Sequence, residues 1–329
     1  MSSSALRNAF RRPALAAVVT ASALLLGGCL STGEDPEGPE VEDSVDLQVD
    51  PARVMVQSSG QGPGQMLSFS DTGEQETTVE IAEGFDQSAG GTDAIDVAAP
   101  EGTDIDTETV TLPLTASSAP ADEPEGETEV AADREVSWRV GTPEHTDAAL
   151  SGDLASAEGF ALDLRSDGNG QVSTVGFAAP VDATDEGRST VESALMKLLS
   201  LPVVFPDEPV GPGAVWSVDS RVTGEATLLQ TTTYTLTAAD GDRVELDVSV
   251  TQRPALGALS LEGQPGAPED AGTLNVLNSN TTSSGSLTVD LTKPLPVAGR
   301  VDYTTRVVYG TEGSDVRVAQ DSTSTLSFG

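Results

Sequence analysis

Two residue types that often carry strong side-chain chemistry occur only once each in this chain, as Cys29 and His145. A Ser-His-Asp triad or a zinc site needs a set of such residues close together, which one histidine and one cysteine do not supply. The sequence also lacks a G-x-S-x-G elbow, an S-x-x-K motif followed by S-D-N, a phosphate-binding loop and a G-x-G-x-x-G motif. We therefore expect a protein that is not an enzyme, and we interpret His145 as an ordinary exposed residue.

Carboxylates are the remaining candidates for chemistry, because 53 of the 329 residues are Asp or Glu. No pair of them is flanked by the aromatic residues that usually build a sugar site, which argues against a glycosidase. Asp167-Gly168-Asn169 and residues 104–108 offer oxygen ligands for calcium, but neither has the spacing of an EF-hand loop. We interpret the first segment as a hairpin turn, and we expect neither a metal site nor a cofactor.

The N-terminus has the layout of an export signal. Arg7, Arg11 and Arg12 precede an apolar run over residues 14–26, and no acidic residue occurs before Glu34. As a helix this run would be roughly 20 Å long, which is too short for the roughly 30 Å hydrocarbon core of a bilayer. We therefore expect an export signal and no permanent transmembrane helix.

Cys29 directly follows this apolar run. The string Leu26-Gly27-Gly28-Cys29 resembles the lipobox of bacterial lipoproteins, with an aliphatic residue, two small residues and then cysteine. The resemblance implies that Cys29 receives a diacylglyceryl group with fatty acids such as palmitate, and that cleavage makes it the mature N-terminus. We expect a protein anchored by lipid to the extracytoplasmic side of the cell membrane.

The composition excludes one class of partner. Without residues 1–28 the chain carries 53 acidic and 13 basic residues, a formal charge of about −40. Phosphate contacts need clustered Lys and Arg, so we expect no nucleic acid partner. An anionic membrane surface would also repel the protein, which leaves the acyl chains on Cys29 to hold it there. Protein partners are not indicated.

The chain divides by composition into three parts. Residues 1–28 form the predicted signal peptide, and residues 29–44, rich in Pro, Gly and acids, are predicted to be a disordered tether. Residues 45–329 are predicted to form a β-rich extracytoplasmic domain. An acidic low-complexity stretch at 119–133 could divide this domain into two halves, and residues 263–272 are predicted to be a flexible loop.

Short segments of period-two alternation predict strands with one buried face. The clearest are 244–250, 286–291 and 300–309. Asp167–Gly170 and Asp240–Asp242 carry residues that suit hairpin turns, which indicates antiparallel pairing. The weaker candidates are 45–49, 53–57, 66–70, 78–82, 109–114, 136–140, 160–165, 171–177, 214–222, 228–238, 273–277, 315–319 and 323–328.

One amphipathic helix is predicted over residues 189–200. Its apolar residues follow helical spacing on one side, a pattern formed by Val191, Ala194, Leu195, Leu198 and Leu199. Ser189 and Glu192 have the spacing of a capping box at its start, and Pro202 would end it. We expect the apolar side to pack against the concave face of a sheet.

The most distinctive string, residues 201–216, is rich in Pro and Gly and ends in Trp216. It resembles an uncharacterised family of bacterial, largely actinobacterial, lipoproteins that carry an LP-x-x-PVG-x-GA-x-W string after a short helix. Segments 233–236, 285–291 and 294–299 are similar too, so that the resemblance covers about residue 159 to the C-terminus. It implies a cell location and an architecture but no catalytic residue. We interpret the string as a rigid connection that directs Trp216 into the core, in preference to a binding site.

Together these features predict a mainly β fold, an antiparallel curved sheet or sandwich with one short amphipathic helix. Because one helix covers only part of a sheet, we expect an apolar groove between them, lined by Val191, Leu195, Leu198 and Leu199. The predicted function is binding of an apolar or amphipathic, lipid-like ligand without catalysis. The alternative is a structural or protein-interaction module of the cell envelope, with a filled core and no groove.

Overall fold

The computed structural model describes residues 39–70, 73–124, 130–222, 228–260, 273–311 and 313–329. All of the described residues belong to one compact unit, Gly38–Gly329. The predicted lipobox, formed by Leu26, Gly27, Gly28 and Cys29, lies outside the described residues, as does the whole of the predicted flexible loop at 263–272.

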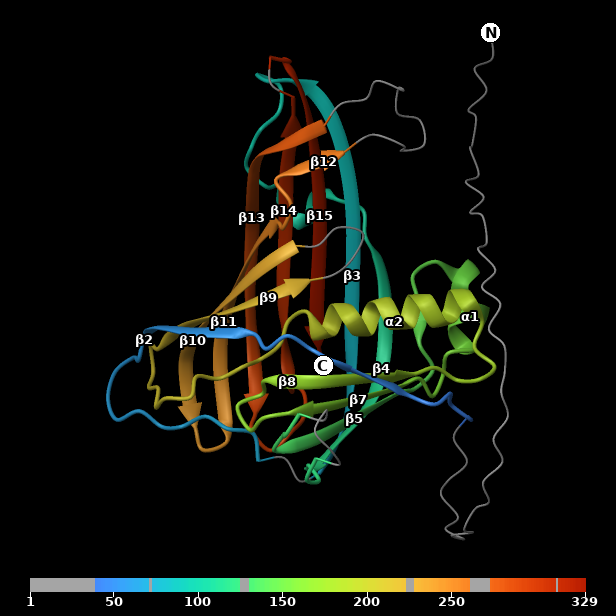
Figure 1. The fold of residues 1–329 in the computed structure, drawn as a ribbon, viewed down its shortest axis with the longest axis vertical. Helices are drawn as coiled ribbons and strands as arrows, with labels where there is room; N and C mark the ends of the chain where they lie inside the picture. The colour runs from blue at the N-terminus through green and yellow to red at the C-terminus, as the bar shows by residue number, and fades with distance from the viewer. Residues whose placement is uncertain (1–38, 71–72, 125–129, 223–227, 261–272, 312) are drawn as a thin grey trace. The chain divides into compact units, whose positions relative to one another are not determined.

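The described residues form a single sheet of fifteen strands, and every paired neighbour is antiparallel (Figure 1). The prediction of a mainly β, antiparallel fold is confirmed. The main path through the sheet is β1-β8-β7-β5-β4-β3-β15-β14-β13-β11-β10-β9-β2, with β6 added to β4 and β12 to β13. In chain order the strands are β1 Val45–Gln48, β2 Arg53–Ser58, β3 Glu74–Gly91, β4 Glu108–Pro120, β5 Arg134–Val140, β6 Glu144–His145, β7 Ala161–Ser166, β8 Val172–Ala178, β9 Val215–Val222, β10 Leu228–Asp240, β11 Arg243–Pro254, β12 Ala258–Ser260, β13 Thr273–Asp290, β14 Ala298–Gly310 and β15 Val316–Phe328.

The two edges of this sheet are neighbours in the chain. β1 pairs with β8 at one end of the strand order and β2 pairs with β9 at the other, yet only residues 49–52 connect them. Such a connection spans at most about 17 Å even when fully extended. The sheet must therefore bend until its edges approach each other, and in Figure 1 β5, β7 and β8 run across the direction of β3, β13 and β15.

Some strands are longer than their apolar pattern. Segments 273–277 and 286–291, predicted as two strands, belong to the single strand β13, and 315–319 and 323–328 both belong to β15. The intervening residues are polar on both faces, which hides a strand from a search for apolar alternation. Segment 66–70 is not a strand, although Gln65 forms an isolated bridge to Val210.

The sheet is continuous across the acidic stretch at 119–133. β4 ends at Pro120 and β5 begins at Arg134, and these two residues are paired directly. The last residues of the segment predicted to be a disordered tether contact the folded unit instead. Val41 forms a bridge with Pro180, and Glu42 forms an ion pair with Arg188. These contacts place residues 39–44 against the folded unit.

Two short α-helices accompany the sheet, α1 Ser151–Ala155 and α2 Asp185–Leu199, with 3-10 turns at Gly102–Asp104 and Ala148–Leu150. The predicted helix at 189–200 corresponds to α2, but it begins four residues earlier. Thr184 is its N-cap and accepts a hydrogen bond from the Gly187 amide at 3.1 Å, so the predicted capping box at Ser189 is wrong. Asp185 and Glu186 favour this start because acidic side chains are stabilised at a helix N-terminus.

The apolar side of α2 packs on what we call the inner face of the sheet. Val191 and Leu195 are 0% exposed and Ala194 is 3% exposed, all within the main hydrophobic core. Trp216 is also 0% exposed, and its indole N–H donates to the Val204 carbonyl at 2.8 Å. Trp216 stacks on Tyr234 with ring centroids 5.6 Å apart. The prediction that residues 201–216 direct Trp216 into the core is confirmed.

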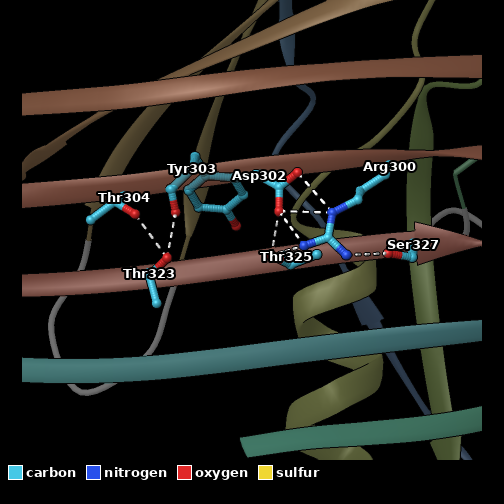
Figure 2. Close-up of polar contacts among 7 residues, drawn as sticks. All are labelled: Arg300, Asp302, Tyr303, Thr304, Thr323, Thr325 and Ser327. Carbon is cyan, nitrogen blue, oxygen red and sulfur yellow. Dashed lines mark hydrogen bonds and ion pairs between the residues drawn. The ribbon is translucent and has the colours of Figure 1, made fainter. Parts of the chain in front are cut away.

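The opposite, outer face carries polar side chains with partners of their own. Figure 2 shows Arg300 and Asp302 of β14 joined to each other and to Thr325 and Ser327 of β15. Further along, the loop between β3 and β4 covers this face and accepts a hydrogen bond from Asn280 at Val97 and another from Thr282 at Ala99. This face of β13 is therefore polar and yet covered.

Candidate ligand-binding groove

The four residues predicted to line a groove do not share one. Val191 and Leu195 are fully buried in the core, with no exposed surface. Leu198, 4% exposed, and Leu199 line a small cavity of about 90 Å³ beneath the C-terminal end of α2. The apolar side of α2 is thus mostly sealed against the sheet, because residues 201–205 and 294–296 fill the space that the helix leaves.

A much larger hollow, of about 1050 Å³, lies along the polar side of α2. We call it the α2 groove. It is bounded by α2, by the inner face of β3, β14 and β15, and by parts of β9, β10 and β11. The described residues that line it are Glu83, Gly84, Phe85, Asp106, Thr107, Glu108, Ser189, Glu192, Ser193, Met196, Lys197, Val222, Leu228, Gln252, Thr305, Val307, Tyr309, Gln320, Ser322, Thr323 and Ser324.

The floor of the α2 groove is a network of amide and hydroxyl groups that crosses the sheet. The Gln252 side-chain amide donates to the Gln230 Oε1 at 2.8 Å, and the Thr305 hydroxyl donates to the Gln252 Oε1 at 3.1 Å. Thr305 also bonds the Thr281 hydroxyl at 3.0 Å. Gln230 donates to the Ser200 carbonyl at the end of α2 at 2.6 Å. Because these buried groups satisfy one another, the floor is held in one arrangement.

Lys197 stands where α2 meets the floor. Its ammonium lies 2.6 Å from Glu83 of β3 and donates to the Ser324 hydroxyl of β15 at 3.1 Å. Burial disfavours the charged form, but the Coulombic effects of Tyr303 and Glu83 outweigh it and raise the pKa of Lys197. The hydroxyl of Tyr303 is buried and has no hydrogen-bond partner among the described residues. Lys197 therefore remains a cation and ties the helix to two strands.

Apolar side chains form the walls of the α2 groove. Phe85 is 61% exposed and Met196 is 41% exposed, which is high for large apolar residues. Val307 and Tyr309 continue the strip along β14, on the same side of the strand as Thr305. The groove therefore offers an apolar wall beside a hydrogen-bonding floor.

The charged residues at the groove are predominantly acidic. Glu83, Asp106, Glu108 and Glu192 line it, whereas Lys197 is the only basic residue in its described lining. Since Lys197 already pairs with Glu83, the remaining carboxylates dominate the local field. An anionic ligand would meet repulsion there, and a neutral or cationic ligand would not.

One feature of the sequence could have indicated the position of this groove. Residues 278–286 contain only Asn, Ser, Thr and Gly, and they form the middle of β13. A strand that is polar on both faces marks a part of the sheet that no apolar core covers. The contribution of Gln252, by contrast, depends on strand register, and that of Lys197 depends on how α2 packs against β3 and β15, so neither could be predicted from the sequence.

The other sequence candidates have structural roles. Asp167–Gly170 forms the turn between β7 and β8, with the Gly170 amide donating to the Asp167 carbonyl at 3.0 Å, which confirms the hairpin. His145, predicted to be exposed, is instead half-buried in β6, because it pairs with β4 and its Nδ1 accepts a hydrogen bond from the Asp147 amide. Within the described ranges, no group of three or more His, Cys, Asp or Glu residues is placed to hold a metal ion. No helix in this part of the chain is long and apolar enough to cross a membrane.

Comparison with known proteins finds no relative of this chain. No protein-family model, no curated protein sequence and no solved structure matches the chain.

Proposed function

We propose that this protein is an extracytoplasmic lipoprotein, anchored to the cell membrane through Cys29, that binds an amphipathic ligand in the α2 groove without chemical conversion. The observation that carries the proposal is the groove itself, about 1050 Å³ with an apolar wall beside a hydrogen-bonding floor. Binding sites for small molecules typically have volumes of about 300 to 1,000 Å³ and pair apolar walls with a few fixed polar groups.

The charges around the groove limit the class of ligand that it can bind. Its head group carries hydrogen-bonding atoms for Gln252 and Thr305, and it bears no net negative charge, because Asp106, Glu108 and Glu192 surround the site. Its apolar part lies along Phe85, Met196 and Val307. A sealed groove would support the alternative, a structural module of the envelope.

The test uses residues 30–329 secreted behind a signal peptide that is cleaved without lipidation, so that the chain carries no acyl group of its own. Solvent extraction and mass spectrometry of the purified protein would identify bound amphiphiles, and titration with dodecyl maltoside below its micellar concentration would measure affinity for a neutral probe. We expect saturable binding at one site. The Met196→Glu variant places a charge on the apolar wall and should weaken that binding at least tenfold.

The chain supplies a matched control. Met55 on β2 is 40% exposed, like Met196, but it does not line the groove. Met55→Glu should leave the affinity for dodecyl maltoside unchanged. If neither the parent nor Met55→Glu binds the probe, or if both Met variants lose binding equally, the α2 groove is not the ligand site.

A further inference from the structure

One edge of the sheet is open along β3. β4 pairs with β3 only over residues 74–83, whereas β15 pairs with it as far as Gly91. In Figure 1 β3 continues upward past β4. In the described part of the chain, residues 85–89 therefore have a strand neighbour on one side only, and we call these residues the β3 edge.

The pairing of β3 with β15 shows which main-chain groups face the open side. Thr78 and Gly329 exchange two hydrogen bonds, of 2.9 and 3.1 Å, and Thr92 donates to the Asp315 carbonyl at 2.9 Å. In an antiparallel pair such bonded residues recur at every second position. The register between the two strands is unbroken from residue 79 to residue 91, so the even-numbered residues of β3 bond β15 along its whole length.

Within the β3 edge, Asp86 and Ser88 thus bond β15, and the N–H and C=O groups of Phe85, Gln87 and Ala89 point to the open side. None of the latter groups has a hydrogen bond to a described residue. The whole edge is exposed, and Phe85 is 61% exposed. A row of unpaired main-chain groups of this kind is a template for another strand.

The β3 edge also lacks the features with which proteins usually block an exposed edge. It contains no proline, no lysine and no bulge. The loop that follows β3 does not cover it, because this loop turns onto the outer face, where Asn280 donates to Val97 and Thr282 donates to Ala99. The β3 edge is therefore suited to a partner in extended conformation.

The charges around the β3 edge determine which kind of strand it accepts. Asp86 is paired in the sheet with Asp321, which already forms an ion pair with Arg306 at 2.6 Å. Asp106 and Glu108 are exposed beside the start of β4. These carboxylates attract a cationic strand, whereas a second copy of the chain would bring the same carboxylates and be repelled.

We propose that the β3 edge is a docking site for an extended, basic segment of a partner protein, which adds to the sheet as a further strand. Its main chain bonds Phe85, Gln87 and Ala89, and its basic side chains meet Asp86 and the carboxylates beside the start of β4. Because side chains alternate along a strand, its apolar residues lie on the inner face and cover the ring of Phe85. The inference does not depend on the function proposed for the α2 groove, since it rests on main-chain groups of the sheet edge.

The probe is a capped peptide of alternating lysine and valine, titrated into the lipid-free chain of residues 30–329 at low salt. Its control is the same peptide with glutamate in place of each lysine. The lysine peptide should bind saturably and about tenfold more tightly than the glutamate peptide. Equal affinities, or no binding of the lysine peptide, would overturn the proposal.

Amide hydrogen exchange followed by NMR locates the bound peptide and contains its own control. In the free chain, the amides of Asp86 and Ser88 should exchange slowly because they bond β15, and those of Phe85, Gln87 and Ala89 should exchange fast. Saturating lysine peptide should slow the second group about tenfold or more and leave the first group unchanged. Fast exchange of the second group at saturation would overturn the proposal. Slow exchange without peptide, growing with protein concentration, would assign the edge to a second copy and overturn it too.

Two variants at one position separate the main chain from the side chain. Gln87→Pro removes an N–H that faces the open side, which a sheet edge tolerates, and should weaken binding of the lysine peptide about tenfold. Gln87→Val keeps that N–H and should bind as the parent does, although it loses the same side-chain hydrogen bond from Gln320, of 2.9 Å. Slow exchange of the Asp86 amide would show that the proline variant keeps its pairing with β15. Unchanged peptide affinity in such a folded Gln87→Pro chain would overturn the proposal, and if this variant fails to fold, the exchange measurement on the parent decides.

Discussion

The ammonium of Lys197 lies 2.6 Å from the carboxylate of Glu83, and this ion pair joins α2 to β3 at the edge of the α2 groove. The Lys197 side chain is 17% exposed and that of Glu83 is 47% exposed. Because the lysine is the more buried partner, loss of Glu83 would leave a partly desolvated cation that still donates to the Ser324 hydroxyl. The pair therefore holds one wall of the groove against the other.

The Glu83→Gln variant should be less stable than the parent by about 1 kcal/mol, since solvent screens the exposed end of this pair. The pKa of Lys197 is raised in the fold above its ordinary value of 10.5. A raised pKa means that its contribution is complete below pH 10.5 and is lost as the pH rises through the folded value. Urea unfolding from pH 7 to 11 would measure this. A Lys197→Met chain with the same alkaline loss as the parent would contradict it.

Neighbouring residues on α2 should respond very differently to the same truncation. Leu195 is 0% exposed in the core, so Leu195→Ala should lower the free energy of unfolding by about 2–5 kcal/mol. Met196 is 41% exposed to the groove, and Met196→Ala should cost less than about 1 kcal/mol. The urea midpoints of the two variants would measure this difference in stability. Equal losses would show that both sides of α2 are packed and that the groove is not open.

The positions of the elements followed from the sequence better than the site did. Strand alternation located β11 most clearly, because its buried face carries Val244, Leu246, Val248 and Val250 in succession. The apolar side of the predicted helix pointed to Val191 and Leu195 as groove residues, but both are buried in the core by segments distant in sequence. The open space lies on the polar side of α2, where Gln230, Gln252, Thr281 and Thr305 meet only through register.

The α2 groove should prefer cationic over anionic amphiphiles of equal chain length. Glu108 and Glu192 line it without a basic partner among the described ion pairs, so dodecyl trimethylammonium should bind more tightly than dodecyl sulfate below their micellar concentrations. Calorimetry at about 0.02 and 0.5 M salt should show that the difference in affinity between the two amphiphiles becomes smaller at high salt, because salt screens exposed charges. The double variant Glu108→Gln, Glu192→Gln should also reduce this difference in affinity. A preference for the sulfate at low salt would refute the charge argument while leaving the groove itself intact.

Cys29 should be acylated, and the mature chain should begin at this residue. The export-like segment before it ends in small residues that allow a peptidase close to the backbone, and the chain has no second cysteine with which to form a disulfide. Two acyl chains hold a protein durably at a membrane where one chain would be marginal. Mass spectrometry of the mature N-terminus should find a diacylglyceryl thioether, and a Cys29→Ser chain should lack both this group and the cleavage before residue 29. A free thiol at Cys29, or a Cys29→Ser chain still processed and bound to membranes, would show that something other than this lipid anchors the protein.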